Sequence, residues 1–225
     1  MSDGSSIFDM LGPVMIGPSS SHTAGVVCIG RVARRMLGSQ PQEVEVTFYN
    51  SFARTYEGHG SDRAVLAGLM DMATDDGRIR EAKAIATEAG MACRFKAVNN
   101  ASAMHPNTVR VIARSGGEQA EVLGVSRGGG LISIVELDKF KCNFTASQHT
   151  LVVAARDMRG SVAFVATLLS NDECNIATMS VDRKARNLSA LLVIEADSVP
   201  RPETIDYLRS QPWIEKVTYL PDIHS

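Results

Sequence analysis

The sequence predicts an α+β fold, and three observations carry that prediction. Apolar residues recur at helical spacing in the early part of the chain. Short strand-like runs separated by glycine turns follow from about residue 92. Residues 148–225 then arrange strands and helices in the order β-α-β-β-α-β. With 225 residues, 44% of them hydrophobic, the chain can bury a core in one large domain or two small ones.

The first domain is expected to cover residues 1–147, with its helices early and an antiparallel meander late. Helices are expected at Ala24–Leu37, from Ser61 or Asp62 to about Met72, and from Asp75 or Asp76 to Ala89. Strands are expected at Glu43–Tyr49, Ala92–Val98, Thr108–Ser115, Gln119–Val125 and Leu131–Leu137. The remaining segments are read as glycine turns at 116–117 and 128–130, a loop at Asn50–Gly60 and a short polar passage at Phe140–Gln148.

A second domain is expected at residues 148–225. Its predicted strands are Thr150–Ala155, Cys174–Arg183, Leu188–Glu195 and Ile214–Leu220. Its predicted helices are Ser161–Leu169 and Glu203–Ser210, and the polar turn Lys184–Asn187 joins the two central strands. This order is the split βαβ arrangement of a ferredoxin-like domain.

The composition argues against several classes of protein. The 23 Lys and Arg residues balance 25 Asp and Glu residues, so the chain lacks the basic excess of a nucleic-acid binder. It has no apolar stretch of about eighteen residues to span a membrane, and Met1–Gly4 lacks the basic region of a secretory signal. The four cysteines form no C-x-x-C pair, which suits reduced thiols in a cytoplasm and argues against a metal cluster held wholly by this chain.

The run Gly17–Thr23 is the first candidate site. It places three serines, a histidine and a threonine directly before a predicted helix: Ser19, Ser20, Ser21, His22 and Thr23. The first turn of a helix offers unpaired N–H groups and the positive end of its dipole, which favour a carboxylate or phosphate. An imidazole beside such an anion is placed for proton transfer. The alternative is an ordinary Ser/Thr N-cap with a solvent-facing histidine, although a cap needs only one hydroxyl.

The second candidate is His59, which lies in the aperiodic segment before a predicted helix. Gly58 and Gly60 remove side chains on both sides of it and let backbone and ligand approach closely. A structural and a catalytic role for this histidine are both open on the sequence alone.

The third candidate is Met104–Asn107, where Pro106 holds His105 in an extended conformation with Asn107 beside it. By itself this motif is also typical of an ordinary turn. Together the three segments supply histidines, hydroxyls and an amide, which suits a small carboxylate substrate and proton transfer. The sequence has no P-loop, Rossmann glycine fingerprint or nucleophile elbow.

These segments resemble the beta chain of iron–sulfur-dependent L-serine dehydratase, also called L-serine ammonia-lyase. The resemblance rests on Ser6–Met10, Gly17–Thr23, Ser51–Asp62 and His105–Asn107, and it spans the first domain. Ser61 stands where the family usually has threonine, and Asn50 where glycine is common. The second domain looks like an ACT domain, a regulatory module that typically pairs with another copy and binds an amino acid at the interface.

The resemblance implies that L-serine loses its β-hydroxyl and α-proton and yields pyruvate and ammonia. It implies a 4Fe-4S cluster that acts as a Lewis acid on the leaving hydroxyl. The ligands of that cluster would belong to a cysteine-rich partner alpha chain and not to this chain. The sequence leaves open whether K⁺ is required and whether L-threonine is accepted.

Within that activity, we predict that the hydroxyls of Ser19, Ser20, Ser21 and Thr23 hold the substrate carboxylate at the start of the helix. Ser51, His105 and Asn107 are expected to support the substrate. His59 is the first candidate for the base that takes the α-proton, and His22 is the second.

The ACT-like domain has a candidate regulatory site at Asp157, Gly160 and Asn175, which are expected to meet an amino acid or to serve dimerisation alone. A function of another class is a regulatory amino-acid-binding protein without a catalytic role. The glycine-flanked His59 favours the lyase, because a binding-only site has little use for a placed base. A serine hydrolase is poorly supported, since no acid is placed to orient a base.

Overall fold

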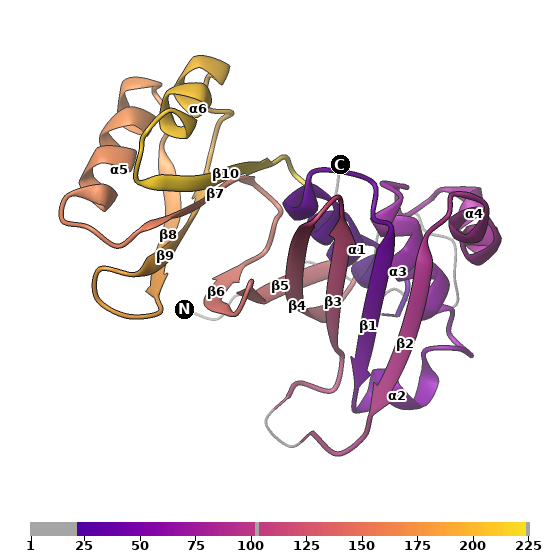
Figure 1. Cartoon of the computed structure of the whole chain (residues 1–225). Helices are drawn as coiled ribbons and strands as arrows, with labels where there is room; N and C mark the ends of the chain where they lie inside the picture. The colour runs from indigo at the N-terminus through magenta and orange to yellow at the C-terminus, as the bar shows by residue number, and fades with distance from the viewer. Residues whose placement is uncertain (1–21, 102–103, 224–225) are drawn as a thin grey trace.

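The strands of this chain form two sheets in the computed structural model, which describes residues 22–101 and 104–223. The first sheet has the strand order β2-β1-β3-β4-β5-β6, and the second has the order β10-β7-β9-β8. Figure 1 shows the second sheet and its two helices beside the first sheet. The predicted α+β class is confirmed.

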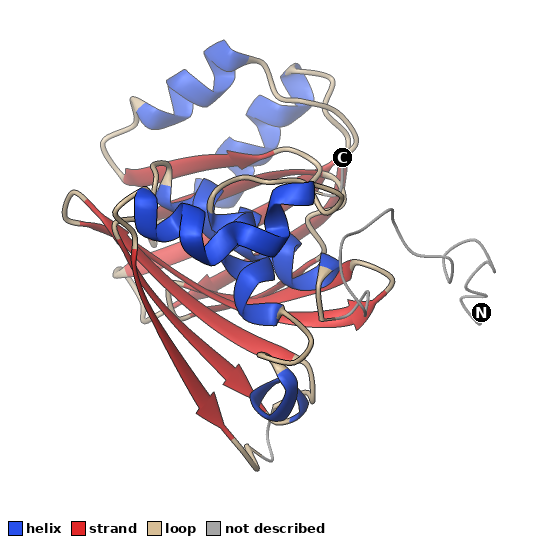
Figure 2. Cartoon of the chain, turned by 90° about the vertical axis from the view of Figure 1, so that its right-hand side faces the viewer, coloured by secondary structure: helices blue, strands red, loops and turns tan. Residues whose placement is uncertain are grey.

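The first sheet is built from residues 43–144 and carries its helices on one face, as Figure 2 shows. Its strands are β1 (Glu43–Tyr49), β2 (Ala92–Val98), β3 (Thr108–Ser115), β4 (Glu118–Gly128), β5 (Leu131–Leu137) and β6 (Phe140–Phe144). The helical segments of this region are α1 (Ala24–Leu37), α2 (Ser51–Thr55), α3 (Ser61–Leu69), the 3-10 helix η1 (Gly77–Glu81) and α4 (Ala82–Glu88). None of the described helices is long and apolar enough to cross a membrane.

Three predictions for this region were wrong. The aperiodic segment Asn50–Gly60 contains the short helix α2, and the polar passage Phe140–Gln148 contains β6. The single helix expected up to Ala89 is η1 followed by α4, and the side chain of Asp76 caps η1 by accepting from the N–H of Arg78. The antiparallel meander is confirmed for β3 to β6. Strand β2 pairs with β1 in parallel, because the helical segments between the two strands carry the chain back to the same end.

The helices α1 and α3 cross at a point where each has a glycine. A methyl group on Gly68 would lie 2.1 Å from the carbonyl oxygen of Val27, and one on Gly30 would lie 2.6 Å from that of Val65. The backbones can therefore approach this closely only because both side chains are hydrogen. This contact sets how α3 lies against α1, and the loop that carries His59 leads directly into α3.

The second sheet confirms the predicted ferredoxin-like order. Its elements are β7 (His149–Arg156), α5 (Ser161–Asn171), β8 (Ile176–Arg183), β9 (Ser189–Ala196), α6 (Pro202–Arg209) and β10 (Ile214–Leu220). All three strand pairs are antiparallel.

The central strands β7 and β9 are buried on both faces. Leu151 and Leu192 pack in the core that includes α5 and α6, whereas the neighbouring Val152 and Val193 pack in the core of the first sheet. Because both faces are covered, these strands read as continuous apolar runs and not as alternating ones. The second sheet is therefore joined to the first through apolar contacts.

We predict that Gly68→Ala destabilises the chain by about 1–3 kcal/mol or more, since the added methyl group meets backbone atoms that cannot rotate away. Urea unfolding measures the change. Gly77→Ala is the matched control, because nothing lies within 4 Å of its added methyl group, and its free energy of unfolding should stay within about 1 kcal/mol of wild type. Equal effects of the two substitutions would contradict the assigned contact.

Candidate functional site

The first part of the candidate site is the start of α1, where Thr23 occupies the N-cap position. Its side chain makes no capping hydrogen bond, although the residue is only 2% exposed. The Oγ1 atom of Thr23 is buried and has no hydrogen-bond partner among the described residues. The ordinary N-cap interpretation therefore does not apply to Thr23. The predicted residues Ser19, Ser20 and Ser21 lie outside the described residues.

The two candidate bases lie side by side. The rings of His22 and His59 meet edge to face with their centroids 4.6 Å apart, and Phe52 contacts His22 in a similar geometry at 4.9 Å. The backbone N–H of His59 donates to the carbonyl oxygen of Thr55 at 2.9 Å, which sets the loop after α2. Gly60 has a φ of 73°, the left-handed region that favours glycine, and it leads directly into α3.

The Met104–Asn107 segment is tied to the same region by backbone hydrogen bonds. The carbonyl oxygen of Pro106 accepts from the N–H groups of Ser51 and Phe52, at 3.0 and 3.4 Å. His105 is exposed, and its Nδ1 accepts from the N–H of Asn107 at 3.1 Å. The neutral ring therefore carries its proton on Nε2. The structure thus brings this segment next to the start of α2.

A serine that the sequence analysis missed lies against α1. A methyl group on Gly25, in the first turn, would lie 2.2 Å from the Oγ of Ser126 on β4. This hydroxyl is fully buried and has no hydrogen-bond partner among the described residues. The N–H of Ser126 donates to the carbonyl oxygen of Asn107 at 3.0 Å, so the third segment also reaches the helix start.

Burial and neighbouring charges favour the neutral forms of His22 and His105. Burial lowers the pKa of His22, and the positive charge that His59 can carry lowers that pKa further. Partial desolvation also lowers the pKa of His105, with a smaller contribution from Arg127. Neutral imidazoles can accept a proton, as a general base must.

Unpaired polar atoms gather in this part of the molecule. Besides the hydroxyls of Thr23 and Ser126, the Nδ1 atom of His59 is buried without a hydrogen-bond partner among the described residues. Each such atom costs about 1–3 kcal/mol if nothing satisfies it. Orphaned groups that gather at a helix start are typical of a site that awaits a polar ligand.

Comparison with known proteins places these segments in a family. Residues 6–136 match the family model of the serine dehydratase beta chain. The chain is 42% identical to a probable L-serine dehydratase beta chain of Bacillus subtilis strain 168, over 96% of this chain and 98% of that one. It is 34% identical to the L-serine dehydratase beta chain of Peptoniphilus asaccharolyticus, over 85% of this chain and 87% of that one. The chain belongs to the serine dehydratase beta-chain family.

A solved structure aligns with the second sheet of this beta chain. It is the ACT domain of GTP pyrophosphokinase from Chlorobium tepidum. The match covers 32% of this chain and 95% of that chain, with 19% identity and a TM-score of 0.26. Because so low a TM-score carries no argument, the ferredoxin-like topology rests on the strand order described above.

Both departures of this beta chain from the family pattern fit the geometry. Asn50 has a φ of 52°, where glycine is favoured, and its side-chain amide donates to the carbonyl oxygens of Ala101 and Met104, each at 3.0 Å. Ser61 is fully buried, and its Oγ donates to the carbonyl oxygen of His22 at 2.9 Å. A threonine hydroxyl would make the same bond.

The four cysteines of this beta chain lie on separate elements. Cys28 is in α1, Cys93 in β2, Cys142 in β6, and Cys174 precedes β8. Burial raises the pKa of Cys28 and of Cys142 to about 12, so both are thiols and not the thiolates that bind iron. Among the described residues, no group of three or more His, Cys, Asp or Glu could hold a metal ion. These residues do not fit an iron–sulfur cluster.

The predicted regulatory residues of the beta chain do not come together within one copy. Asp157 accepts from Arg183 Nη1 at 3.2 Å, and Gly160, with a φ of 84°, precedes α5. Asn175 donates to the carboxylate of Asp197 at 2.7 Å, just before β8. Because β7, β9 and β8 run antiparallel in turn, Asn175 lies at the opposite end of the sheet from Asp157.

We predict that the stability of the chain falls as the pH drops below about 6.5, the ordinary pKa of histidine. Because the pKa of His22 is lowered in the folded chain, the unfolded chain binds more protons at His22 when the pH lies between the folded and unfolded pKa values.

Replacing His59 with Asn should raise the pKa of His22, as NMR titration of the ring protons can measure. His149→Gln is the control, since His149 bonds Tyr219 in the second sheet. An unchanged titration of His22 in the His59→Asn chain would contradict the assigned coupling.

Proposed function

We propose that this beta chain supplies the carboxylate-binding and proton-accepting half of an L-serine dehydratase active site. A partner alpha chain would complete the site and hold the 4Fe-4S cluster. The observation that supports the proposal best is the group of buried, unpaired polar atoms beside two contacting histidines at the start of α1. The hydroxyls in that group can donate to an anion, and the Nδ1 of His59 can accept a proton. L-serine carries both a carboxylate and an acidic α-proton.

The start of α1 suits the substrate carboxylate. The N–H groups of a first helical turn have no partner within the helix and carry partial positive charge. The hydroxyl of Thr23 adds a donor, and Ser19, Ser20 and Ser21 precede it directly in the sequence. The contact between Gly25 and Ser126 brings a further hydroxyl to the same turn.

A neutral histidine beside that carboxylate can take the α-proton. His59 is our first choice, because its buried Nδ1 has no partner among the described residues and can present a lone pair. His22, which contacts it, is the second. In the reaction, the Cα–H electron pair forms the double bond to Cβ while the β-hydroxyl leaves as water after it gains a proton. The aminoacrylate then tautomerises and is hydrolysed to pyruvate and ammonia. A bound iron–sulfur cluster would supply Lewis-acid polarisation of the leaving hydroxyl.

The rest of the chain fits a regulated, cytoplasmic subunit. We propose that residues 148–225 form a separate ACT domain that associates with a second copy of itself. Within that arrangement, Asp157 and Gly160 would meet an amino-acid ligand, and Asn175 would join them only from the other copy. Ser51, His105 and Asn107 would support the substrate from the loops around α2.

We predict that His59→Asn lowers kcat by about 100-fold or more in the enzyme assembled with its alpha chain, because the α-proton loses its acceptor. Pyruvate formation from L-serine under anaerobic conditions measures the effect. His22→Asn is the matched variant, and it should lower kcat less. A His59→Asn enzyme that pairs normally and keeps wild-type turnover would overturn the assignment of the base. Wild-type turnover in both variants would favour a binding-only role for this chain.

We predict that Thr23→Val raises KM for L-serine by about tenfold and changes kcat little, because it removes a hydrogen bond to the carboxylate in ground and transition states alike. Steady-state kinetics with L-serine check this result. Thr55→Val is the control, because its hydroxyl donates to the carbonyl oxygen of Ser51 within α2 at 2.9 Å. An unchanged KM in the Thr23→Val enzyme would remove Thr23 from the binding site.

A further inference from the structure

A large cavity lies between the last turn of α1 and the second sheet with its helix α6, at the end of α1 opposite to His22. Its volume is about 700 Å³, and its walls come from the last turn of α1 on one side and from α6, β10 and the segment before α6 on the other. A cavity of this size suits an organic molecule better than a single inorganic ion. It lies apart from the site proposed for the substrate and from the regulatory residues predicted in the second domain.

The positive and negative charges of the side chains around this cavity do not cancel. Arg35 pairs with Asp71 at 2.6 Å, and Arg209 pairs with Asp206 at 3.0 Å. Arg34 also lines the cavity, and it makes no ion pair within 4 Å among the described residues. The guanidinium of Arg34 and the ammonium of Lys216 are therefore left without an ion-pair partner among the described residues, and four basic side chains face two acidic ones, which favours an anion.

Arg34 lacks a hydrogen-bond acceptor as well as an ion-pair partner. Its Nε is buried and has no hydrogen-bond partner among the described residues. Burial lowers the pKa of Arg34, yet a guanidinium stays protonated at neutral pH. The nearby Lys216 is already engaged, because its Nζ donates to the carbonyl oxygen of Met36 at 2.7 Å. An incoming carboxylate would therefore find Arg34 available.

The opposite wall of the cavity also presents a group of apolar side chains, beside the Arg209–Asp206 pair. The group consists of Val199, Pro200, Pro202, Ile205 and Val217. Such a surface suits a hydrocarbon or aromatic group and offers little to a hydrated ion.

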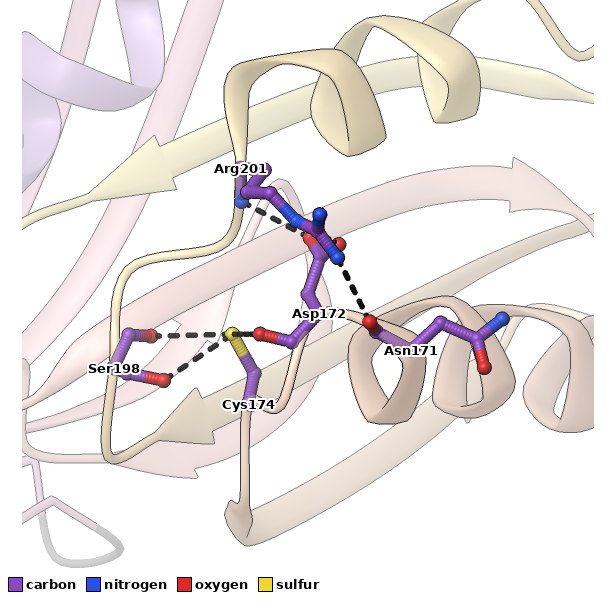
Figure 3. A network of polar contacts seen from close by, with 5 residues as sticks. All are labelled: Asn171, Asp172, Cys174, Ser198 and Arg201. Carbon is purple, nitrogen blue, oxygen red and sulfur yellow. Dashed lines mark hydrogen bonds and ion pairs between the residues drawn. The ribbon is translucent and has the colours of Figure 1, made fainter.

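The segment that carries this wall is held in place by the contacts drawn in Figure 3. Arg201 lies between the two prolines, and its Nε donates to the carboxylate of Asp172 at 2.8 Å, while its Nη2 donates to the carbonyl oxygen of Asn171 at 2.8 Å. The hydroxyl of Ser198 donates to the sulfur of Cys174 at 3.3 Å. The wall is thereby fixed to the end of α5, so the cavity does not depend on a loose loop.

We propose that this cavity binds a small organic carboxylate, with its carboxylate on Arg34 and its apolar body against the wall that includes Pro200 and Ile205. A guanidinium matches a carboxylate through two parallel hydrogen bonds. Because such a ligand contacts α1 on one side and α6 and β10 on the other, it stabilises the present arrangement of α1 and the second sheet.

Calorimetric titration of the full-length chain, alone and assembled with its alpha chain, tests the proposal with 3-phenylpropanoate. We expect binding, and an affinity at least about tenfold lower for the neutral 3-phenylpropanamide and for acetate, which lacks the apolar body. Arg34→Gln should weaken binding of 3-phenylpropanoate by about tenfold or more. Arg94→Gln is the control, because Arg94 is exposed on β2 and does not line the cavity.

A second variant keeps the test independent of the folding of Arg34→Gln. Val199 is 53% exposed at the cavity wall, so Val199→Asp adds a negative charge there without disturbing the core, and it should also weaken binding. Leu188→Asp is its control, since Leu188 is 58% exposed and lies elsewhere. No binding of 3-phenylpropanoate, equal binding of the amide, or undiminished affinity in these two cavity variants would overturn the proposal. The readout is binding, so this outcome is separate from any failure of the proposed lyase function.

Discussion

The burial of α1 between the first sheet and α3 is the constraint on which the rest of the structure depends. Within α1, only Arg31, Arg34 and Arg35 escape full burial. Only the termini of this helix have backbone groups that are not hydrogen-bonded within it. The glycines Gly30 and Gly68 make that enclosure possible by letting α3 lie against it. The loop before α3 then places His59 beside His22, the residue before the N-cap of α1.

The sequence revealed the local structure well and missed the direction of one strand, β2. Strand β1 alternates because only one of its faces is fully buried, and its boundaries were predicted to the residue. The direction of β2 was missed, because alternation is the same in parallel and antiparallel strands. Strand β6 was missed because it is short and half polar, and Phe140 and Phe144 become core residues only when the second sheet packs on them.

The candidate site shows the same division between local signals and tertiary contacts. His22, His59 and His105 were found because their residue types carry chemistry and glycine or proline stands beside two of them. Ser126 gave no signal, since a serine within an apolar strand is ordinary, and only its contact with Gly25 makes it notable. The role of Phe52 could not be predicted either, because its contact with His22 depends on helix α2, which the sequence analysis did not predict.

The two ends of α1 contact two different parts of the protein. Its first turn carries partial positive charge and lies among the unpaired groups of the candidate site, whereas its last turn carries partial negative charge. At that last turn, Lys216 of β10 donates to the carbonyl oxygen of Met36. Arg31, nearer the middle of α1, donates to the carbonyl oxygen of Ile223. Both bonds connect the helix to the C-terminal part of the chain. Because a buried helix moves as one rigid body of about 21 Å, a shift of the second sheet would be carried along α1 to His22. Helix α1 is thus one physical connection between the second sheet and the candidate site, beside the contacts that β6 makes with β8 and β9.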